Sequence, residues 1–482
     1  MGVPSNIIVP FVGVSFDNSA AVQGAAMLPV NALLIGQKIA AGTAVAGVTY
    51  LVTSADDVRI LGGVGSHIHR MAMKWFNTNN LTPTHITVLA DAAGSAAATN
   101  AIPLTGTATA PGELPLYLDG VRYAVSVATG DLAATVGAAL ATLINLDTAA
   151  SVTAAFATGV LTLTAKNKGV TAGDVGIVVA YYPGEMVPSG LTVGTITTTP
   201  GTGEPDVTAA LAAVGDAWYN ILCSSYSDGT NMAKIETFLE SQAGPTIQRD
   251  GEYYFAKKDT LSNLVTFGTD TARNCQYVVA IAGTGCPESV TNIAAAEAAM
   301  VALSITDDPA VPLHRMKLDL LPAPPSSRFT MSERNILAQS GISTLRHDNG
   351  VQTDATVTMY LKNSAGASDI SYQYQNTIFI LMNLRYTFVQ RILLKYSRAK
   401  LADSAERVAS GQQIITPDLG KAEAVSWFLQ MEEAGQVEDL KQFKKDLVCR
   451  RSTTNPNRLE WILPPNLINQ FIVGSADLQF RL

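Results

Sequence analysis

WYNILCSSYSDGTNMAKIETFLESQ, residues 218–242, joins a strand-forming run to a helix-forming run. Its first eight residues predict a strand, and NMAKIETFLESQ (231–242) predicts a helix. The pattern repeats downstream, where the strand-forming YVVAIAG (277–283) comes before the Ala-rich helix TNIAAAEAAMVALSI (291–305). Strands and helices that alternate at this spacing predict a sheet with crossover connections, which is the hallmark of an α/β domain.

The same α/β pattern is present earlier in the chain, in residues 21–95. ALLIGQ (32–37) predicts a buried strand, SHIHRMAMKWFNTN (66–79) an amphipathic helix, and THITVLADA (84–92) an alternating strand. We therefore expect one α/β core domain that is built from two separate parts of the chain, residues 21–95 and residues 206–349.

The composition changes in residues 96–205, which contain few charges, much Thr, Ala and Gly, and several short strand-forming runs. One helix is expected there, DLAATVGAALATLIN (131–145). The pair Asp119-Gly120 stands between two strand-forming runs, which is a strong signal for a tight β-hairpin. TTTPGTGEPD (197–206) closes the segment as a linker. These features predict a β-rich α+β domain inserted into the α/β core.

The pattern differs again in residues 350–469, which predict a C-terminal α+β domain. VTMYL (357–361) and LEWIL (459–463) predict strands, while a long helix is expected over roughly 375–402 and another at GKAEAVSWFLQMEEAG (420–435). The fold class expected for the whole chain is α/β and α+β multidomain. It combines a mixed-sheet α/β core, an inserted β-rich domain, a C-terminal α+β domain and extended arms at both ends.

Both ends of the chain are apolar and strand-forming, without an obvious partner in the chain itself. Residues 1–20 contain two strand-like runs interrupted by Pro4 and Pro10, which a strand tolerates only at its start or at a sheet edge. The chain ends in LINQFIVGSADLQFRL (467–482). Residues 1–20 and 470–482 are therefore predicted to be arms that add strands to a neighbouring copy. The side chains expected in these strands are Ile7, Ile8, Val9, Phe11, Val12, Val14, Phe471, Ile472, Val473, Leu478 and Phe480.

Composition limits the classes of function. The apolar fraction is 47%, and charged residues make up 15%, compared with about a quarter in a typical soluble protein. A surface with so little charge suggests that partner subunits cover much of it, although an Ala/Gly/Thr-rich enzyme would have the same composition. The net charge of −8 argues against a nucleic-acid partner bound through phosphate contacts.

No membrane or targeting segment is expected. The chain has no run of about 18 uninterrupted apolar residues, and its first residues lack the basic start and continuous apolar stretch of a signal peptide. The four cysteines, Cys223, Cys275, Cys286 and Cys449, show neither a CxxC pair nor a zinc-site spacing. We expect them to be reduced thiols of a cytosolic protein.

No catalytic residues, cofactor-binding residues or metal ligands are predicted. GGVGSH (62–67) superficially resembles a phosphate-binding loop, but His67 stands where the lysine of such a loop belongs, so the glycines predict a turn before the helix. His67 and His69 point to different sides of a helix and cannot share a metal ion. GTGCPES (283–289) contains a cysteine but is predicted to be a turn after a buried strand.

The charge pattern of residues 432–451 leaves two interpretations open. Acidic residues come first, and Lys441, Lys444 and Lys445 follow them. Acidic residues early and basic residues late suit the dipole of a solvated helix. The alternative is a basic patch presented to an acidic protein surface.

Four stretches together resemble the contractile tail sheath proteins of phages, and most of all the sheaths of Mu-like phages. They are VPFVGVSFDNSA (9–20), LLIGQK (33–38), VRILGGVGSHIHRMAMKWFNTN (58–79) and NPNRLEWILPPNLINQFIVGSADLQFRL (455–482). The resemblance covers both ends of the chain and the α/β middle. It depends on several structural motifs in the right order and not on a catalytic signature.

The resemblance implies a structural virion protein that forms hexameric rings stacked into a six-fold helical sheath around a tail tube. A baseplate signal makes such a sheath contract, which drives the tube through the host envelope without nucleotide hydrolysis. The implied partners are further copies of the chain, the tail tube protein, and baseplate and tail terminator proteins, with no nucleic acid and no membrane insertion. Assembly is expected in the cytoplasm of the host bacterium.

The resemblance also implies roles for parts of the chain. The N-terminal arm of one subunit and the C-terminal arm of another add strands to the C-terminal sheet of a third. Residues 350–469 correspond to the sheath domain that faces the tube, the inserted domain lies outside, and Lys441, Lys444 and Lys445 are the implied tube contacts. These contacts must break on contraction, which suits screened surface charges.

Two other functions remain open at this stage. A non-contractile helical or shell-forming protein would need the arms but no second state. A cytosolic α/β hydrolase would need a nucleophile paired with a base, and the sequence offers no convincing pair.

Overall fold

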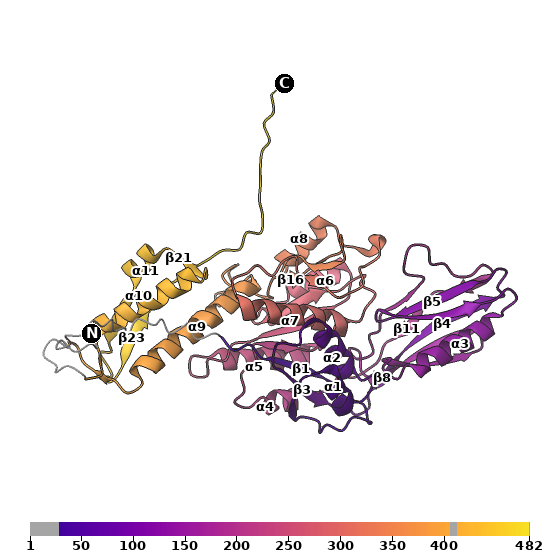
Figure 1. Cartoon of the computed structure of the whole chain (residues 1–482), viewed down its shortest axis with the longest axis horizontal. Helices are drawn as coiled ribbons and strands as arrows, with labels where there is room; N and C mark the ends of the chain where they lie inside the picture. The colour runs from indigo at the N-terminus through magenta and orange to yellow at the C-terminus, as the bar shows by residue number, and fades with distance from the viewer. Residues whose placement is uncertain (1–27, 405–411, 482) are drawn as a thin grey trace, which may run out of the picture. The chain divides into compact units, whose positions relative to one another are not determined.

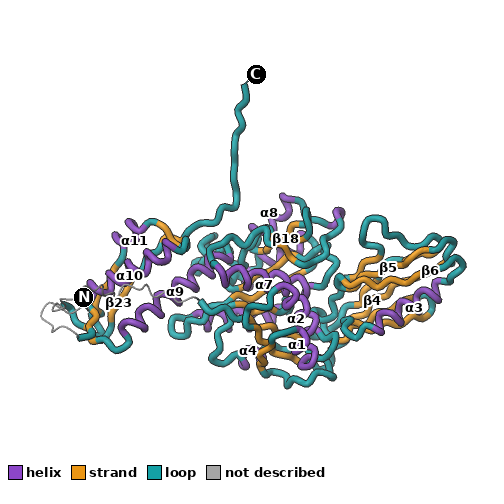
Figure 2. Tube along the Cα trace, in the orientation of Figure 1, coloured by secondary structure: helices purple, strands orange, loops and turns teal. Residues whose placement is uncertain are grey.

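The computed structural model describes residues 28–404 and 412–481. Two compact units can be followed in Figures 1 and 2: Pro29–Met382 with the last residues of the chain, and Asn383–Asn466. The predicted strand residues of the N-terminal arm, Ile7, Ile8, Val9, Phe11, Val12 and Val14, lie outside the described residues. The mixed α/β class with several sheets is confirmed, whereas the predicted domain boundaries remain predictions.

A seven-stranded sheet forms the centre of the Pro29–Met382 unit, in the order β16-β14-β13-β12-β1-β3-β2. All neighbours are parallel except β2 and β3. The chain builds first on one side of β1 and then on the other, so the strand order reverses between β1 and β12. The predicted crossover sheet is thus confirmed. The strands are β1 (Ala32–Gln37), β2 (Thr49–Val52), β3 (Thr84–Leu89), β12 (Ile221–Cys223), β13 (Glu252–Lys257), β14 (Val278–Ala282) and β16 (Ile342–Ser343).

Helices cover both faces of this sheet. On one face α2 and α7 pack against each other and against the strands. On the opposite face α4, α5, α6 and α8 share one apolar core with Leu33 of β1 and with Tyr253 and Phe255 of β13. Alternation along the strands separates these two sets of side chains. The helices are α1 (Ala55–Gly62), α2 (His67–Thr78), α4 (Thr208–Ala213), α5 (Gly229–Ala243), α6 (Leu261–Gly268), α7 (Val290–Asp307) and α8 (Met331–Gln339).

Residues 97–199 form two antiparallel sheets and the helix α3 (Ala133–Leu146). One sheet has the order β10-β4-β8-β7 with β11 also paired to β4, and the other has the order β6-β5-β9. Both sheets and α3 bury apolar side chains in a core of their own. The strands are β4 (Ala97–Gly106), β5 (Gly112–Leu118), β6 (Val121–Val127), β7 (Val152–Ala157), β8 (Val160–Lys168), β9 (Ile177–Val179), β10 (Leu191–Val193) and β11 (Thr197–Thr199).

The predicted hairpin at Asp119-Gly120 is confirmed. Leu118 pairs with Val121, and the two residues between them have φ angles of 48° and 88°. Positive φ at both central positions is the type I′ geometry that an Asp-Gly pair favours. The tight turn leaves the Asp119 carboxylate free to bond outside its own sheet.

The strand predicted at residues 357–361 is wrong. Val357 makes one isolated bridge, but its N–H donates to Ser343 Oγ (3.0 Å), and the N–H of Leu361 donates to Asn274 Oδ1 (2.7 Å). A strand needs a single neighbour whose backbone supplies the acceptors in sequence. Side chains satisfy part of this backbone, while the N–H groups of Thr358 and Met359 donate to the carbonyls of Gln373 and Val278, which lie in two separate segments. A strand-like sequence pattern gives no sign of such scattered partners. Nearby, β15 (Lys317–Leu318), β18 (Val351–Thr353) and β17 (Leu345–Arg346) form a small antiparallel sheet.

The Asn383–Asn466 unit combines an antiparallel helix pair with a β-hairpin. Helix α9 (Gln375–Tyr396) runs antiparallel to α10 (Pro417–Glu433). Two hydrogen bonds show this orientation: Asn383 Nδ2 donates to Gln436 Oε1 (2.7 Å), just after α10 ends, and Arg391 Nε, further along α9, donates to Glu423 Oε2 (2.7 Å), nearer the start of α10. Helix α9 ends earlier than the predicted position near 402. The other elements are β19 (Lys400–Leu401), β20 (Ile414–Ile415), β21 (Val437–Glu438), α11 (Leu440–Asp446), β22 (Val448–Arg451), β23 (Leu459–Ile462) and β24 (Asn466–Leu467).

Within the described chain, α9 alone is long and apolar enough to cross a membrane by length and composition. One such helix is weak evidence for a membrane span, because core helices of soluble proteins have the same length and composition. Phe379 and Met382 of α9 are buried in protein, and further along the helix Thr387 Oγ1 accepts a hydrogen bond from Trp427 Nε1 (3.0 Å).

Candidate assembly surfaces and a polar junction

The C-terminal segment, residues 468–481, forms no strand with any described part of the chain. From Ser475 onward apolar and polar residues alternate, which places Ala476, Leu478 and Phe480 on one side of an extended chain. Such alternation would fix the register of a strand whose apolar side is buried. The large apolar side chains are exposed: Phe471 (79%), Ile472 (47%), Val473 (83%), Leu478 (92%) and Phe480 (77%). Their role in strands between subunits remains a prediction.

The β22–β23 hairpin has open edges. Within the described residues its sheet contains two strands, so each strand has one edge without a strand partner. One face packs on α10, where Trp461 Nε1 donates to the Gly420 carbonyl (3.1 Å) and Cys449 is buried. A Cβ on Gly420 would lie 2.6 Å from Cys449 Sγ, so a glycine is required there. A two-stranded sheet is marginally stable alone, and open edges are the places where another strand adds.

The three lysines predicted to contact a tube lie together on α11. Lys441, Lys444 and Lys445 are exposed and spaced at i, i+3 and i+4, so they share one side of the helix. Phe443 is buried on the other side and stacks on Phe428 with ring centroids 4.2 Å apart. Residues 383–466 carry thirteen Lys and Arg against ten Asp and Glu, a net +3 in a chain of net −8. The structure thus presents these lysines as an exposed basic face.

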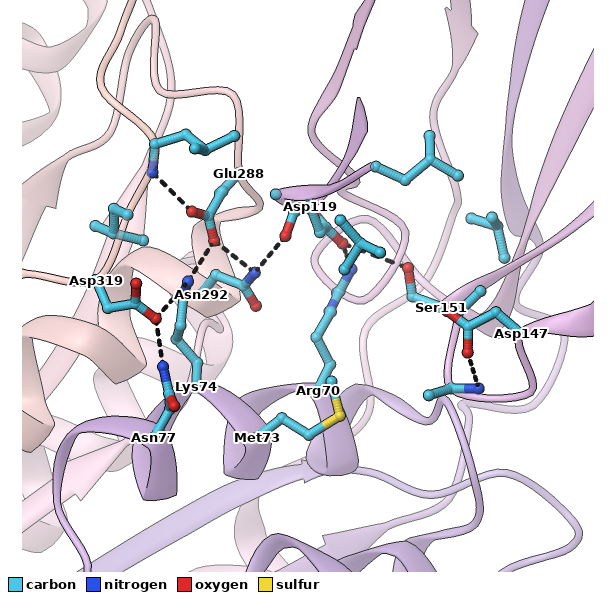
Figure 3. A pocket seen from close by; sticks show the side chains of 18 of the residues that line it. Arg70, Met73, Lys74, Asn77, Asp119, Asp147, Ser151, Glu288, Asn292 and Asp319 are labelled. Carbon is cyan, nitrogen blue, oxygen red and sulfur yellow. Dashed lines mark hydrogen bonds and ion pairs between the residues drawn. The ribbon is translucent and has the colours of Figure 1, made fainter. Parts of the chain in front are cut away.

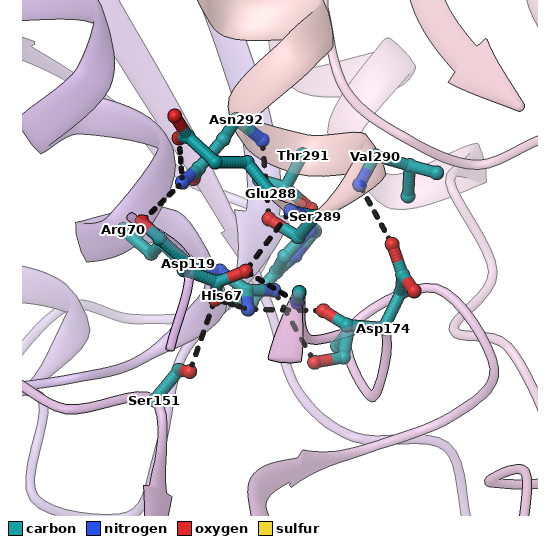
Figure 4. A network of polar contacts seen from close by, with 12 residues as sticks. His67, Arg70, Asp119, Ser151, Asp174, Glu288, Ser289, Val290, Thr291 and Asn292 are labelled. Carbon is teal, nitrogen blue, oxygen red and sulfur yellow. Dashed lines mark hydrogen bonds and ion pairs between the residues drawn. The ribbon is translucent and has the colours of Figure 1, made fainter. Parts of the chain in front are cut away.

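A polar junction connects the β-rich segment to the N-terminus of α7 (Figure 4). We use this name for Arg70, Lys74, Asp119, Asp174, Glu288 and Ser289. Asp119 Oδ1 accepts hydrogen bonds from the backbone N–H groups of Gly176 (2.8 Å) and Ser289 (2.9 Å). Asp174 Oδ2 accepts from the N–H of Val290 (2.7 Å). Two carboxylates therefore satisfy N–H groups at the start of α7 and interact favourably with the positive end of its dipole.

Two buried ion pairs complete the polar junction (Figure 3). Arg70 Nη1 lies 2.7 Å from Asp119 Oδ2, with 5% and 9% of the two side chains exposed. Lys74 Nζ lies 2.9 Å from Glu288 Oε2. Burial raises the pKa of Glu288, and the Lys74 ammonium offsets part of that rise. These residues border a pocket of about 470 Å³. Removing one member of such a pair would leave a buried charge without its partner.

The carboxyl end of β1 is closed by the chain itself. In doubly wound sheets ligands bind beyond the strand ends, at the point where the strand order reverses. Here Gln37 Nε2 donates to Asp91 Oδ1 (2.7 Å) and to the Lys168 carbonyl (2.7 Å). Asn167 Nδ2 donates to the Lys38 carbonyl (2.8 Å). The end of β8 therefore occupies the position that such folds use for ligands.

His67 takes part in this closure as a neutral ring. Its Nδ1 accepts from the N–H of Gln37 (3.2 Å), so its Nε2 carries the proton and donates to Thr291 Oγ1 (2.9 Å). Burial, together with the nearby Arg70 charge, lowers the pKa of His67 to about 3. The imidazole thus links β1 to α7 as an uncharged hydrogen-bonding group.

The two loops that superficially suggested chemistry are structural turns, as predicted. Gly63 and Gly65 have φ angles of 88° and 76° immediately before α2, and the N–H of Gly65 donates to His69 Nδ1 (3.1 Å). In GTGCPES, burial raises the pKa of Cys286 to about 12. A thiol with that pKa is rarely ionised at neutral pH and is a poor nucleophile.

The polar junction could not be recognised from the sequence. The Asp-Gly pair at 119–120 predicts a hairpin but says nothing of the α7 N-terminus, which is 170 positions away. Asp174 lies in a loop without a recognisable motif. Ser289 is the N-cap of α7, and a serine directly before an apolar helical run is the signal that could have located this helix start.

Two comparisons identify the family. Residues 201–359 match the family model of the phage tail sheath protein central domain. Over 482 residues the chain is 35% identical to the Mu-like prophage FluMu tail sheath protein of Haemophilus influenzae, which covers 100% of this chain and 99% of that protein. The chain therefore belongs to the phage tail sheath family and is a contractile tail sheath subunit, a structural component of the virion. Family membership argues against the two alternative functions, a hydrolase and a non-contractile shell protein. The relatives are structural proteins and indicate no catalytic activity.

Solved structures give a weaker likeness. The sheath tail protein from Desulfitobacterium hafniense is 12% identical with a TM-score of 0.49, over 95% of this chain and 100% of that chain. The helical sheath of the anti-feeding prophage in its contracted state is 12% identical with a TM-score of 0.47, over 98% and 99%. At these TM-scores the likeness adds nothing to the family assignment, which depends on the sequence similarity.

Proposed function

We propose that the chain polymerises as hexameric rings stacked into a six-fold helical sheath around a tail tube, and that terminal arms link the subunits by strand exchange. The observation that carries this proposal is the exposed C-terminal segment, whose large apolar side chains have no partner in the described chain. Burial of each such side chain contributes roughly 1.5–3 kcal/mol. A neighbouring copy that buries them would gain enough to offset the cost of ordering the segment.

The acceptor in this proposal is the β22–β23 hairpin of another copy. A strand added with Leu478 and Phe480 towards α10 would continue the buried face that Cys449 and Trp461 begin. The N-terminal arm of a second copy would take the remaining edge. A marginal two-stranded sheet would thereby become a four-stranded sheet assembled from three subunits.

Strand exchange also supports the proposed mechanism of contraction. Backbone hydrogen bonds between strands can hold subunits together while the bodies of the subunits rearrange from a metastable extended state to a shorter one. The free energy difference between the two assembled states would drive the tube through the host envelope without nucleotide hydrolysis. The baseplate would supply the signal and a terminator protein would close the far end. Assembly would take place in the host cytoplasm.

The basic face of α11 is the proposed tube contact. Lys441, Lys444 and Lys445 are exposed together in a segment that is positive overall, which suits an acidic tube surface. Exposed charge pairs contribute at most about 1 kcal/mol each and weaken with salt. Contacts of this strength can guide assembly and still break when the sheath contracts.

Reversing two of these charges should impair assembly on the tube specifically. For Lys444→Glu with Lys445→Glu, we expect at least about a tenfold loss of co-sedimentation with tubes at low salt, since repulsion replaces attraction. Self-polymerisation of the sheath protein should persist. The matched control is Lys317→Glu with Lys362→Glu, which makes the same charge change at two exposed lysines elsewhere. Equal co-sedimentation of the two double variants would refute the tube assignment.

Electron microscopy of the purified full-length chain tests the proposed function directly. Negative stain should show striated tubes with a hollow lumen, which fills when tube protein is present. A reconstruction should show six-fold rings and a terminal strand from one copy on the hairpin of another. A stable monomer that turns over ester substrates would overturn the proposal.

A further inference from the structure

Two glutamates lie in the core of the Pro29–Met382 unit, away from the surfaces proposed for assembly. Glu252 on β13 and Glu297 on α7 are 0% and 1% exposed. Glu252 Oε1 and both carboxyl oxygens of Glu297 are sealed from solvent and have no hydrogen-bond partner within the described residues. A carboxylate in such a site has a large desolvation cost, whereas the neutral acid is tolerated.

The hydroxyl of Tyr254 gives an independent reason for a neutral Glu252. This hydroxyl lies 2.7 Å from Glu252 Oε2 and 3.0 Å from Gln375 Oε1. It has one proton and can donate to only one of these two oxygens. Gln375 Oε1 cannot donate, so both contacts are hydrogen bonds only if Glu252 is protonated and donates to Tyr254. The geometry thus fits a neutral carboxyl group.

The first turn of α9 reaches this pair of carboxyl groups through Gln375, which contacts Tyr254 and interacts with Glu297. Gln375 begins α9 and is fully buried. Its Nε2 donates one of its two protons to Ser343 Oγ (3.2 Å), and the interaction of Gln375 with Glu297 offsets only part of the effect of burial on that carboxyl group. The chain continues along α9 from Met382 into Asn383, where the second compact unit begins.

Among the residues that the structure describes, no cation contributes to the pKa of either carboxyl group. Burial raises the pKa of Glu297 to about 8, and Gln375 offsets that rise in part. Burial, and then the Glu297 charge, raise the pKa of Glu252 well above its ordinary value, while the hydrogen bond between Glu252 and Tyr254 lowers it. The other ionisable groups facing them are Tyr254 of β13 and, beside it, Cys223 of β12, whose pKa values burial also raises. Burial therefore favours the neutral form of all four groups.

We propose that Glu252 and Glu297 form a proton-dependent latch on the first turn of α9. While both carboxyl groups are neutral, β13, α7 and the start of α9 stay packed around them. When the pair loses a proton, the carboxylate must reach water, and Gln375 must move for it to do so. The latch thereby controls how firmly the start of α9, the connection to the second unit, is held.

The direction of the pH dependence follows from the two protonation states. The closed state holds a proton that an opened, solvated Glu297 would release above its ordinary pKa of 4.5. The latch is therefore fully stable at low pH and weakens as the pH rises from about 4.5. The contribution of Glu297 stops growing above about pH 8, where the closed state also loses this proton.

Hydrogen–deuterium exchange on the full-length chain tests this proposal. We expect the protection factors of residues 375–382, corrected for intrinsic exchange, to fall at least roughly tenfold per pH unit between pH 5.5 and about 8, and less steeply above that pH. Residues 278–282 of β14 serve as the internal reference. Sedimentation at each pH ensures that one assembly state is compared throughout.

Glutamine variants separate the latch from general alkaline loosening. Glu252→Gln with Glu297→Gln keeps the size of both side chains but cannot ionise, so the protection of residues 375–382 should no longer depend on pH. The control Glu433→Gln removes an exposed carboxyl group on α10 and should behave as wild type. An unchanged pH dependence in the double variant would overturn the proposal. So would pH-independent protection in the wild type, a result that does not require any variant to fold.

Discussion

A chain that ends at residue 469 should fold but fail to polymerise. The deletion removes Phe471, Ile472, Val473, Leu478 and Phe480, all of which are exposed in the isolated chain, so it removes no core contact. If a neighbour buries these side chains, the loss of each one weakens the association of two subunits by roughly 1.5–3 kcal/mol. That corresponds to at least about a thousandfold weaker association. Circular dichroism should show an unchanged fold, while sedimentation velocity and negative stain should show the loss of tubes.

Substitutions in the full-length chain test whether the segment acts as a strand. Leu478→Ser with Phe480→Ser changes the apolar side of the alternating run and should abolish tubes. Asp477→Ser with Gln479→Ser changes the polar side and should leave them intact. Full-length tubes from the truncated chain would show that the arm is not the link. Equal effects of the two double variants would show that the segment does not bind as a strand with one buried side.

Asp119→Ala should lower the free energy of unfolding by about 3–5 kcal/mol, because it leaves the buried Arg70 guanidinium without its partner. It also removes the acceptor for the N–H groups of Gly176 and Ser289. Asp119→Asn should cost less, since the amide oxygen can still accept these two bonds. Urea unfolding followed by tryptophan fluorescence is a suitable measurement because Trp75 is buried on α2, the helix that carries Arg70.

An exposed ion pair provides the control for this prediction. Asp56→Ala removes the pair with Arg59, whose side chains are 82% and 46% exposed, and should cost less than about 1 kcal/mol. Arg70→Met with Asp119→Asn removes both buried charges, keeps an acceptor for the N–H groups of Gly176 and Ser289, and should recover much of the stability. Similar losses for Asp56→Ala and Asp119→Ala would mean that the polar junction does not stabilise the fold.

Sequence analysis was most accurate where a local pattern determines the local structure. The buried run at residues 32–37 is a central strand, the amphipathic run at 66–79 is a helix, and the Asp-Gly pair at 119–120 is a tight turn. The exposed side chains from Phe471 to Phe480 also agree with an apolar segment that has no partner in the described chain. Each of these features depends on residues that lie close together in sequence.

Features that depend on distant partners could not be predicted. The bond from Ser289 to Asp119 and the closure of β1 by Asn167 and Lys168 join segments far apart in sequence. At residues 357–361 a strand-like run divides its hydrogen bonds between distant side chains and the carbonyls of two separate segments, so it forms no strand. The β-propensity of residues 357–361 favours a strand, but tertiary contacts determine the structure that these residues adopt.

The carboxylates at the start of α7 limit how the β-rich segment can be redesigned. In particles designed to display a foreign domain, the outer strands of the β-rich segment could be replaced by that domain, because the segment has an apolar core of its own. Replacing the whole segment would remove Asp119 and Asp174, leaving amides of α7 and the guanidinium of Arg70 without acceptors. It would also uncover the end of β1 at Gln37. A successful graft must therefore keep these few inner positions or supply equivalent acceptors.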